Sequence, residues 1–170
     1  SSNNLENKLY LNKGNFKFED ITRLSGTGCQ KGWKTGVSMV DINADGWLDI
    51  YVCRSADGDP SNRKNSLLIN NGDLTFTDRA SDYGLDDNSY STQAAFFDYD
   101  RDGDLDAFLL NHSLLQISNS FNIKVINRID RYPHVGNRLL RNDGGIFVDV
   151  SDTSGIYGPA SNYGLGGGVS

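Results

Sequence analysis

At 170 residues with 37% hydrophobic residues, the chain is large enough to bury a core and too apolar for an intrinsically disordered protein. Its net charge of −6 argues against nucleic acid as a partner, because binding phosphate groups requires clustered Lys and Arg. No apolar run approaches the roughly 20 residues of a membrane-spanning helix, so the sequence predicts no membrane span.

The acidity comes almost entirely from aspartate, which supplies 20 of the 22 acidic residues. A helical protein would favour Glu, whereas Asp suits turns, caps and metal-binding loops. Eight of the aspartates lie within two nine-residue stretches, 41–49 and 98–106, which we call loop one and loop two. The acidity therefore indicates metal binding more than solubility.

The first predicted elements lie in residues 7–22. Asn7–Gly14 and Phe18–Asp20 are short, partly apolar segments bounded by Gly and Asn, and they predict a pair of strands. The pair recurs twice, as Asn65–Gly72 with Phe76–Asp78 and as Asn137–Gly144 with Phe147–Asp149. Because the recurrences close longer units, we interpret 7–22 as the outer half of a unit of which the chain shows only that half.

Residues 33–80 form the first whole unit. An apolar run, Gly36–Asp41, enters loop one, and a second apolar run, Leu48–Cys53, leaves it before the recurring pair. Residues 90–151 repeat this order around loop two, 57 residues later. Four antiparallel strands per repeat form the blade of a β-propeller. The sequence therefore predicts an all-β fold with no helix of consequence.

Two further segments depart from the repeat. Residues 111–136 are longer than their counterpart 54–64, and we favour a packing role for this insertion over a ligand loop or a short helix. Tyr163–Ser170 predicts the first strand of a further blade, because Gly168-Val-Ser170 matches Gly36-Val-Ser38. Since propellers close with at least four blades, we expect an incomplete propeller of two and a half to three repeats. It would be a fragment of a longer protein or would complete its sheets with other chains.

Both loops carry oxygen donors at positions 1, 3, 5 and 9, a main-chain carbonyl at position 7, and Gly at position 6, where the chain turns sharply. Hard oxygen ligands without His or Cys suit Ca²⁺ and not zinc. We therefore predict two Ca²⁺ sites, with tighter binding at loop two because it offers more carboxylates. We expect the Asp104 carboxylate to point outward and the leucine at position 8 to anchor each loop to its sheet. The predicted ligands are Asp41, Asn43, Asp45, Trp47 and Asp49 in loop one, and Asp98, Asp100, Asp102, Asp104 and Asp106 in loop two.

Two alternatives to these sites are weaker. An EF-hand requires Glu at position 12 and flanking helices, but position 12 is Val52 or Leu109 and the flanks are β-like. A pair of metal-free Asx-rich turns is disfavoured, because five aspartates within nine residues would repel one another without a cation.

The combination of loops and flanks resembles the FG-GAP/VCBS repeat family, whose repeats are the blades of integrin-α-like propellers. It is most similar to the ASPIC/UnbV and cartilage-acidic-protein-like groups. The carrying pattern is Asn-x-Leu-Tyr-x-Asn-x-Gly with Phe-x-Asp, then Gly-Val-x-x-x-Asp-x-Asp/Asn-x-Asp-Gly-x-x-Asp; Gln93-Ala-Ala departs from it where the first blade has Gly36-Val-Ser. The resemblance implies Ca²⁺ at both loops, an extracellular or cell-surface location, and adhesion, recognition or scaffolding with a protein or carbohydrate ligand.

No catalytic motif is evident, and we predict a protein that is not an enzyme. His112 and His134 both fall in the insertion, where an incidental role is favoured. One alternative is a subunit of a surface assembly, in which copies of the chain join by strand addition. Another is part of a Ca²⁺-dependent polysaccharide lyase, which would need basic or aromatic side chains beside the metal. Cys29 and Cys53 allow either a disulfide or two thiols.

Overall fold

The computed structural model describes residues 6–29, 32–55, 58–112, 134 and 136–156, and the structural statements below concern this part of the chain. Each of its helices is four residues long, so none in the described part could cross a membrane. The elements are β1 (Tyr10–Asn12), β2 (Phe18–Asp20), α1 (Thr22–Ser25), β3 (Trp33–Val40), β4 (Asp49–Ser55), α2 (Pro60–Arg63), β5 (Ser66–Asn70), β6 (Phe76–Asp78), α3 (Ala80–Tyr83), β7 (Ser91–Phe97), β8 (Asp106–Asn111), β9 (Arg138–Asn142) and β10 (Phe147–Asp149).

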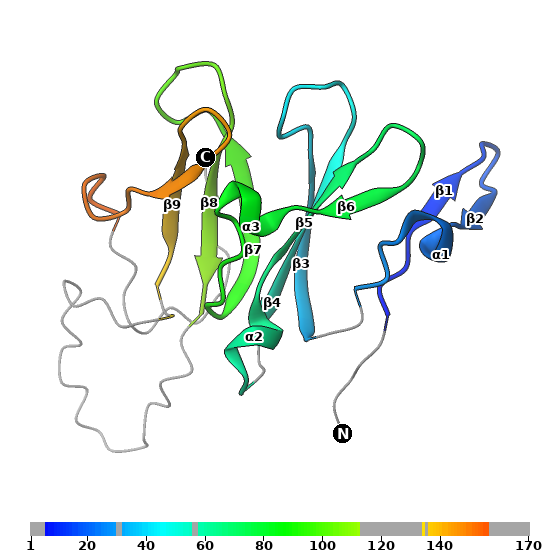
Figure 1. The fold of residues 1–170 in the computed structure, drawn as a ribbon, viewed down its shortest axis with the longest axis horizontal. Helices are drawn as coiled ribbons and strands as arrows, with labels where there is room; N and C mark the ends of the chain where they lie inside the picture. Colours follow the sequence, from blue (N-terminus) through cyan, green and yellow to red (C-terminus); the bar gives the residue numbers. More distant parts are fainter. Residues whose placement is uncertain (1–5, 30–31, 56–57, 113–133, 135, 157–170) are drawn as a thin grey trace.

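The strands form two four-stranded antiparallel sheets and one two-stranded ribbon (Figure 1). The order is β3-β4-β5-β6 in the first sheet and β7-β8-β9-β10 in the second, so each strand pairs with its neighbour in the sequence. The ribbon β1-β2 matches the outer pairs β5-β6 and β9-β10 in sequence. The predicted fold class, all-β with four-stranded propeller blades, is confirmed.

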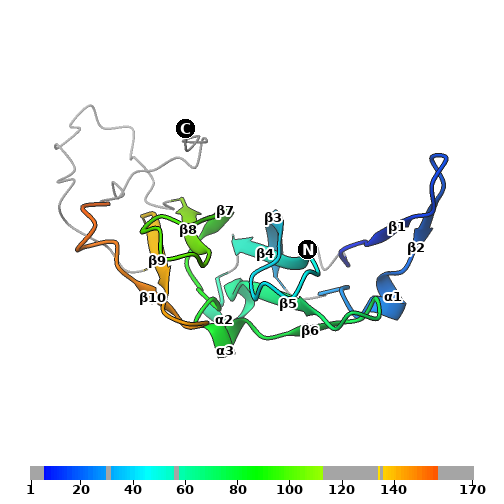
Figure 2. The same ribbon diagram turned by 90° about the horizontal axis from the view of Figure 1, so that it is seen from above.

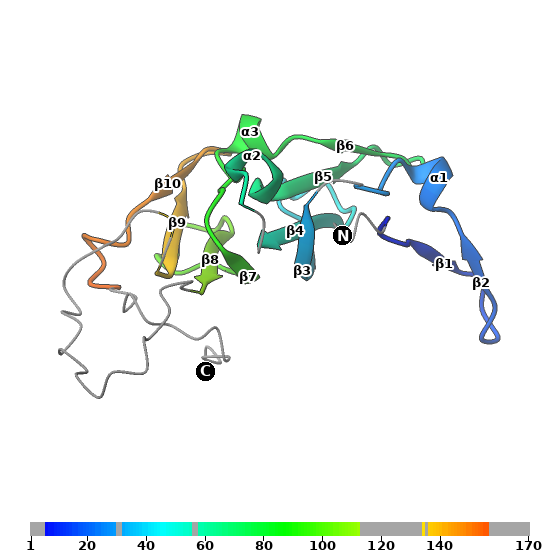
Figure 3. The ribbon, with the colours of Figure 1, turned by 90° about the horizontal axis from the view of Figure 1, so that it is seen from below.

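The sheets lie side by side along an arc (Figures 2 and 3). Because a neighbouring sheet covers each face, the central strand β4 is buried along almost its whole length and consists mainly of Ile, Tyr, Val and Cys. One core joins the two sheets, with Tyr51, Leu67 and Leu85 from the first repeat packed against Leu109 and Leu140 of the second. Burial of these side chains fixes how the two blades lie relative to each other.

The two sheets have equivalent registers. Val40 pairs with Asp49 at the top of β3-β4, and Phe97 pairs with Asp106 at the top of β7-β8. Both hairpins also carry a register shift near the other end, at Lys34/Val37 and at Ser91/Gln93. Loop one and loop two therefore occupy the same place in their blades.

Two predictions fall on segments that the structure does not describe. Of the 111–136 insertion, residues 111, 112, 134 and 136 are described, and the packing role of the remainder stays a prediction. The strand predicted at Tyr163–Ser170 also lies outside the described residues.

His112 has a structural place that its sequence position did not indicate. Its Nε2 atom lies 2.7 Å from the Ser55 hydroxyl, 57 residues earlier, and its ring stacks at a tilt against Tyr90. Arg63 lies over the other partner, with its guanidinium carbon 4.4 Å from the centre of the Tyr90 ring. His112 therefore joins the second blade to the first, and this contact is more than the incidental role favoured from sequence.

The two cysteines are free thiols in the structure, with Cys53 buried and Cys29 half-buried. Burial raises the pKa of the Cys53 thiol to about 12, so the reactive thiolate is scarce at neutral pH. We expect a thiol reagent such as DTNB to label one cysteine in the native protein and two after denaturation. Labelling of Cys53→Ser and Cys29→Ser variants assigns the reactive thiol; rapid native reaction at Cys53 would contradict its burial.

Candidate metal centre

Both Asp-rich loops lie at the same edge of the molecule, at the top of Figure 1, where each joins the first two strands of its blade. The loops turn through left-handed backbone at Ala44 and Gly46 in loop one, and at Arg101 and Gly103 in loop two. Gly46 and Gly103 have φ values of 89° and 100°, beyond the range that side chains accept easily. The Gly at position 6 is thus required by the turn.

The position-9 aspartates, Asp49 and Asp106, fasten the loops to their sheets. Both are fully buried, and each accepts backbone N–H groups at both carboxylate oxygens. For Asp49 the donors are Ile42 at 3.1 Å and Asn70 at 2.8 Å; for Asp106 they are Tyr99 at 2.8 Å and Asn142 at 2.9 Å. Burial raises the pKa of Asp49, and the N–H groups of Asn70 and Ile42 oppose that rise.

Sequence reasoning missed the part played by Asn70 and Asn142. Besides the backbone N–H, each donates its side-chain amide to the carbonyl at position 8, Leu48 or Leu105, at 3.2 Å. The signal was present as the second Asn of the recurring Asn-x-Leu-x-x-Asn segment, which also occurs at Asn12. Its role was hidden because the asparagine meets the loop only after the third strand folds back.

The position-1 aspartates turn inward over their loops. Asp41 accepts from the N–H groups of Asp45 at 3.0 Å and Gly46 at 2.9 Å. Asp98 accepts from Arg101 at 2.7 Å and Gly103 at 3.2 Å. The carboxylates therefore lie within the curl of each loop, where a cation ligand must be.

Loop two brings three carboxylates together. One oxygen each of Asp98, Asp100 and Asp106 lie within 4.8 Å of one another, a spacing that lets one metal ion contact all three. Partial desolvation, followed by repulsion from Asp102 and Asp106, raises the pKa of Asp100. Asp102 accepts the Asp104 N–H at 3.1 Å and so lies on the same curl.

Loop one is arranged differently. Its Asp45 carboxylate accepts from the Trp47 N–H at 2.8 Å and from the Asn43 side-chain amide at 2.9 Å. Among the described residues, only loop two supplies three carboxylates within the spacing given above. The reason lies at position 3, where loop one has Asn43, whose amide ties Asp45 within the loop, and loop two has Asp100.

Two details of the predicted loops are wrong. Asp104 does not simply point outward: its Oδ1 atom is buried and has no hydrogen-bond partner in the described part of the chain. A cavity of about 310 Å³ separates the two loops there, lined by residues including Asn43, Asp104 and Asn142. Leu48 does not anchor loop one, because it is 52% exposed, whereas Leu105 packs against the shared core as expected. The neighbouring blade that covers Leu105 has no equivalent over Leu48.

The donor chemistry of loop two fits Ca²⁺. The converging atoms are all carboxylate oxygens, hard ligands that Ca²⁺ prefers, and the unpartnered Asp104 Oδ1 leaves a further oxygen beside them. Loop one offers the same positions with one amide in place of a carboxylate. Its side chains converge less in this structure.

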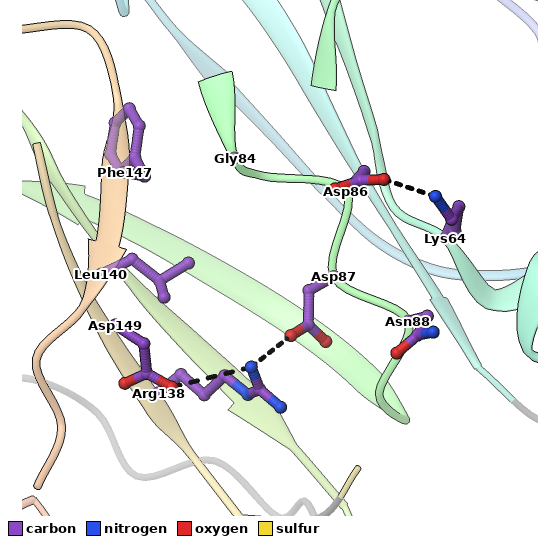
Figure 4. Close-up of a pocket in the computed structure, with 9 residues that line it drawn as sticks. All are labelled: Lys64, Gly84, Asp86, Asp87, Asn88, Arg138, Leu140, Phe147 and Asp149. Atoms are coloured by element: carbon purple, nitrogen blue, oxygen red, sulfur yellow. Dashed lines mark hydrogen bonds and ion pairs between the residues drawn. The ribbon is translucent and has the colours of Figure 1, made fainter. Parts of the chain in front are cut away.

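The largest polar cavity described, about 430 Å³, lies between the blades away from these loops (Figure 4). Its cations are already paired: Lys64 contacts Asp86 at 2.6 Å, and Arg138 contacts Asp87 at 3.0 Å and Asp149 at 3.6 Å. Arg138 opens β9 opposite Leu109, whereas Asp106 begins β8 at the other end of the sheet. The basic residues therefore lie away from the carboxylate cluster.

Comparison with known protein families gives a match to the FG-GAP-like repeat model over residues 1–52 and 54–109. The two matched stretches end within β4 and within β8, so each includes one Asp-rich loop. No curated protein matches the chain at a significant level of similarity.

Proposed function

Because this chain belongs to the FG-GAP-like repeat family, we propose that it is a non-enzymatic, calcium-stabilised repeat module of an extracellular or cell-surface protein. Its role is adhesion, recognition or scaffolding, with a protein or carbohydrate as the ligand. The observation that carries the calcium part is the cluster of Asp98, Asp100 and Asp106 oxygens in loop two.

The ligands at loop two are Asp98, Asp100, Asp102 and Asp106 with the main chain of Asp104, and those at loop one are Asp41, Asn43, Asp45 and Asp49 with the main chain of Trp47. When bound, Ca²⁺ supplies positive charge that offsets the repulsion among the clustered carboxylates. Asp106 couples the loop to the sheet, because its oxygens accept from Tyr99 within the loop and from Asn142 on β9. The ion's effect on the loop is therefore an effect on the blade.

Thermal unfolding in calcium and in EDTA tests the stabilising role. Extracellular Ca²⁺ modules bind with dissociation constants of about 10⁻⁴–10⁻³ M, so 10 mM Ca²⁺ should add about 1.4–2.7 kcal/mol per occupied site. For a chain of this size the melting temperature should rise by roughly 3–10 °C. Mg²⁺ at the same concentration is the control and should do less, because it demands a smaller octahedral site. Equal melting temperatures in EDTA and Ca²⁺ would refute the stabilising role.

The absence of an enzymatic role is part of the proposal, and the ion pairs around the 430 Å³ cavity support it. A lyase needs a basic or aromatic side chain beside its metal, whereas Lys64 and Arg138 are paired with carboxylates away from loop two. Turnover of an acidic polysaccharide by the purified protein, lost in Asp98→Asn, would support the lyase alternative.

A further inference from the structure

The ribbon β1-β2 carries one half of a contact that the two whole blades complete. Asn12 corresponds to Asn70 and Asn142 in the recurring segment. All three asparagines accept a hydrogen bond at Oδ1 from a glycine N–H in the following turn: Gly14 at 2.8 Å, Gly72 at 3.0 Å and Gly145 at 2.6 Å. The ribbon is thus folded locally like the outer pairs of the whole blades.

The difference lies on the other edge of β1. Asn70 and Asn142 donate their backbone N–H groups to Asp49 and Asp106. In the ribbon, the Lys13 N–H donates to Lys17 and the Leu9 carbonyl accepts from Ile21, so residues 9 and 13 face β2. By strand alternation, Asn12 and Tyr10 direct their backbone groups away from β2, to an edge that no other described strand occupies.

A groove beside this edge has a filled counterpart in the second blade. It measures about 390 Å³ and is lined by apolar residues that include Val37, Met39, Ile50 and Val52. Counting 57 residues on from the first blade to the second, their equivalents are Ala94, Phe96, Ala107 and Leu109. Those four belong to or pack against the core shared by the two blades, and Phe96 meets the Tyr51 ring edge-on at 5.6 Å.

The covering differs because the ribbon supplies only an outer pair of strands. Inner strands β3 and β4 cover the equivalent face of the second blade. Over the groove, Ile50 and Val52 are buried near the ribbon, but Val37 and Met39 on the innermost strand remain 59% and 57% exposed. The uncovered part thus corresponds in position to the part that an inner pair of strands covers elsewhere.

We propose that the β1 edge and this groove receive a β-hairpin bearing an Asp-x-Asp/Asn-x-Asp-Gly-x-x-Asp loop. Its second strand pairs with β1, its final loop aspartate accepts from the Asn12 N–H, and its apolar face covers Val37 and Met39. An unrelated strand would meet the backbone edge but would bring no carboxylate to Asn12. This interaction goes beyond the proposed function, since the Asp49 and Asp106 contacts that it copies form without a metal in the structure.

The test adds a copy of residues 90–112, which contain β7, loop two and β8, ahead of residue 6 of the full chain through a flexible Gly/Ser linker. Linking raises the effective concentration of the hairpin to about the millimolar range. Hydrogen exchange is followed at the Tyr10 and Asn12 amides in EDTA and again in Ca²⁺. We expect exchange at both amides to slow at least ten-fold in the fusion relative to the parent chain, in both solutions.

Two matched fusions decide specificity. Changing the final loop aspartate of the added copy to Ala, or making Asn12→Asp in the chain, should return the amide of residue 12 to the exchange rate of the parent. The aspartate introduced by Asn12→Asp can still accept from Gly14, so the turn is preserved while the carboxylates repel. Unchanged exchange in the first fusion overturns the proposal. Equal protection from a scrambled hairpin also overturns it, by showing that the edge takes any strand.

Discussion

Asp106→Asn should lower the free energy of unfolding by about 2–3 kcal/mol, even in excess EDTA. Asp106 is fully buried, and its two oxygens accept from the Tyr99 and Asn142 backbone N–H groups. An asparagine offers one acceptor oxygen and one NH₂ group, so one of these buried N–H groups would face another donor. Chemical denaturation in EDTA measures the loss, because metal binding then contributes nothing to the difference.

Two aspartates serve as controls for that measurement. Asp82 pairs with Arg79 on the surface, with its side chain 55% exposed, so Asp82→Asn should change stability by well under 1 kcal/mol. Asp98 accepts from exposed loop N–H groups, so Asp98→Asn should have a smaller effect than Asp106→Asn in EDTA and should remove the gain from Ca²⁺ at loop two. If all three variants unfold alike in EDTA, Asp106 does not fasten the loop to the sheet.

Gly36→Ala should destabilise the junction between the blades by about 1–3 kcal/mol. A Cβ atom on Gly36 would lie 2.3 Å from the Thr92 carbonyl oxygen and 2.2 Å from the Gln93 side-chain oxygen. The glutamine side chain can move, but the Thr92 carbonyl is backbone, so β3 must separate from β7. That movement would strain the bonds from the Thr35 hydroxyl to the Ser91 carbonyl at 2.7 Å and from the Ser38 hydroxyl to the Ala94 carbonyl at 2.6 Å.

Gly58→Ala is the matched control, since a Cβ atom there meets nothing within 4 Å and the backbone has no left-handed φ. Its stability should equal or slightly exceed that of the parent, because alanine restricts the unfolded chain. Denaturant midpoints at constant slope compare the two variants. A Gly36→Ala midpoint equal to that of Gly58→Ala would show that the blades are not in the close contact described.

Local patterns in the sequence were sufficient to predict the fold class. The recurring Asn-led segments, the apolar runs and the Gly-punctuated loops repeat with a period of 57 residues, and each feature lies within one hairpin. Contacts between blades could not be predicted in this way. Gln93 departs from the family pattern at the position of Gly36, and the structure shows that these two residues meet each other across the junction.

The candidate site divides along the same line. Ligand positions follow from spacing along one loop, whereas the orientation of Asp104 and the exposure of Leu48 depend on which neighbouring blade covers the loop. Identical spacing therefore predicted two similar sites. In the structure, an amide at Asn43 and the missing cover over Leu48 make loop one less convergent than loop two.

Isothermal titration of the metal-free protein with Ca²⁺ tests the central claim most directly. We predict two ions per chain with dissociation constants of about 10⁻⁴–10⁻³ M, the tighter one lost in Asp98→Asn and the weaker one retained. No binding heat and no saturation at millimolar Ca²⁺, in a protein that remains folded, would contradict the assignment of these loops as calcium sites.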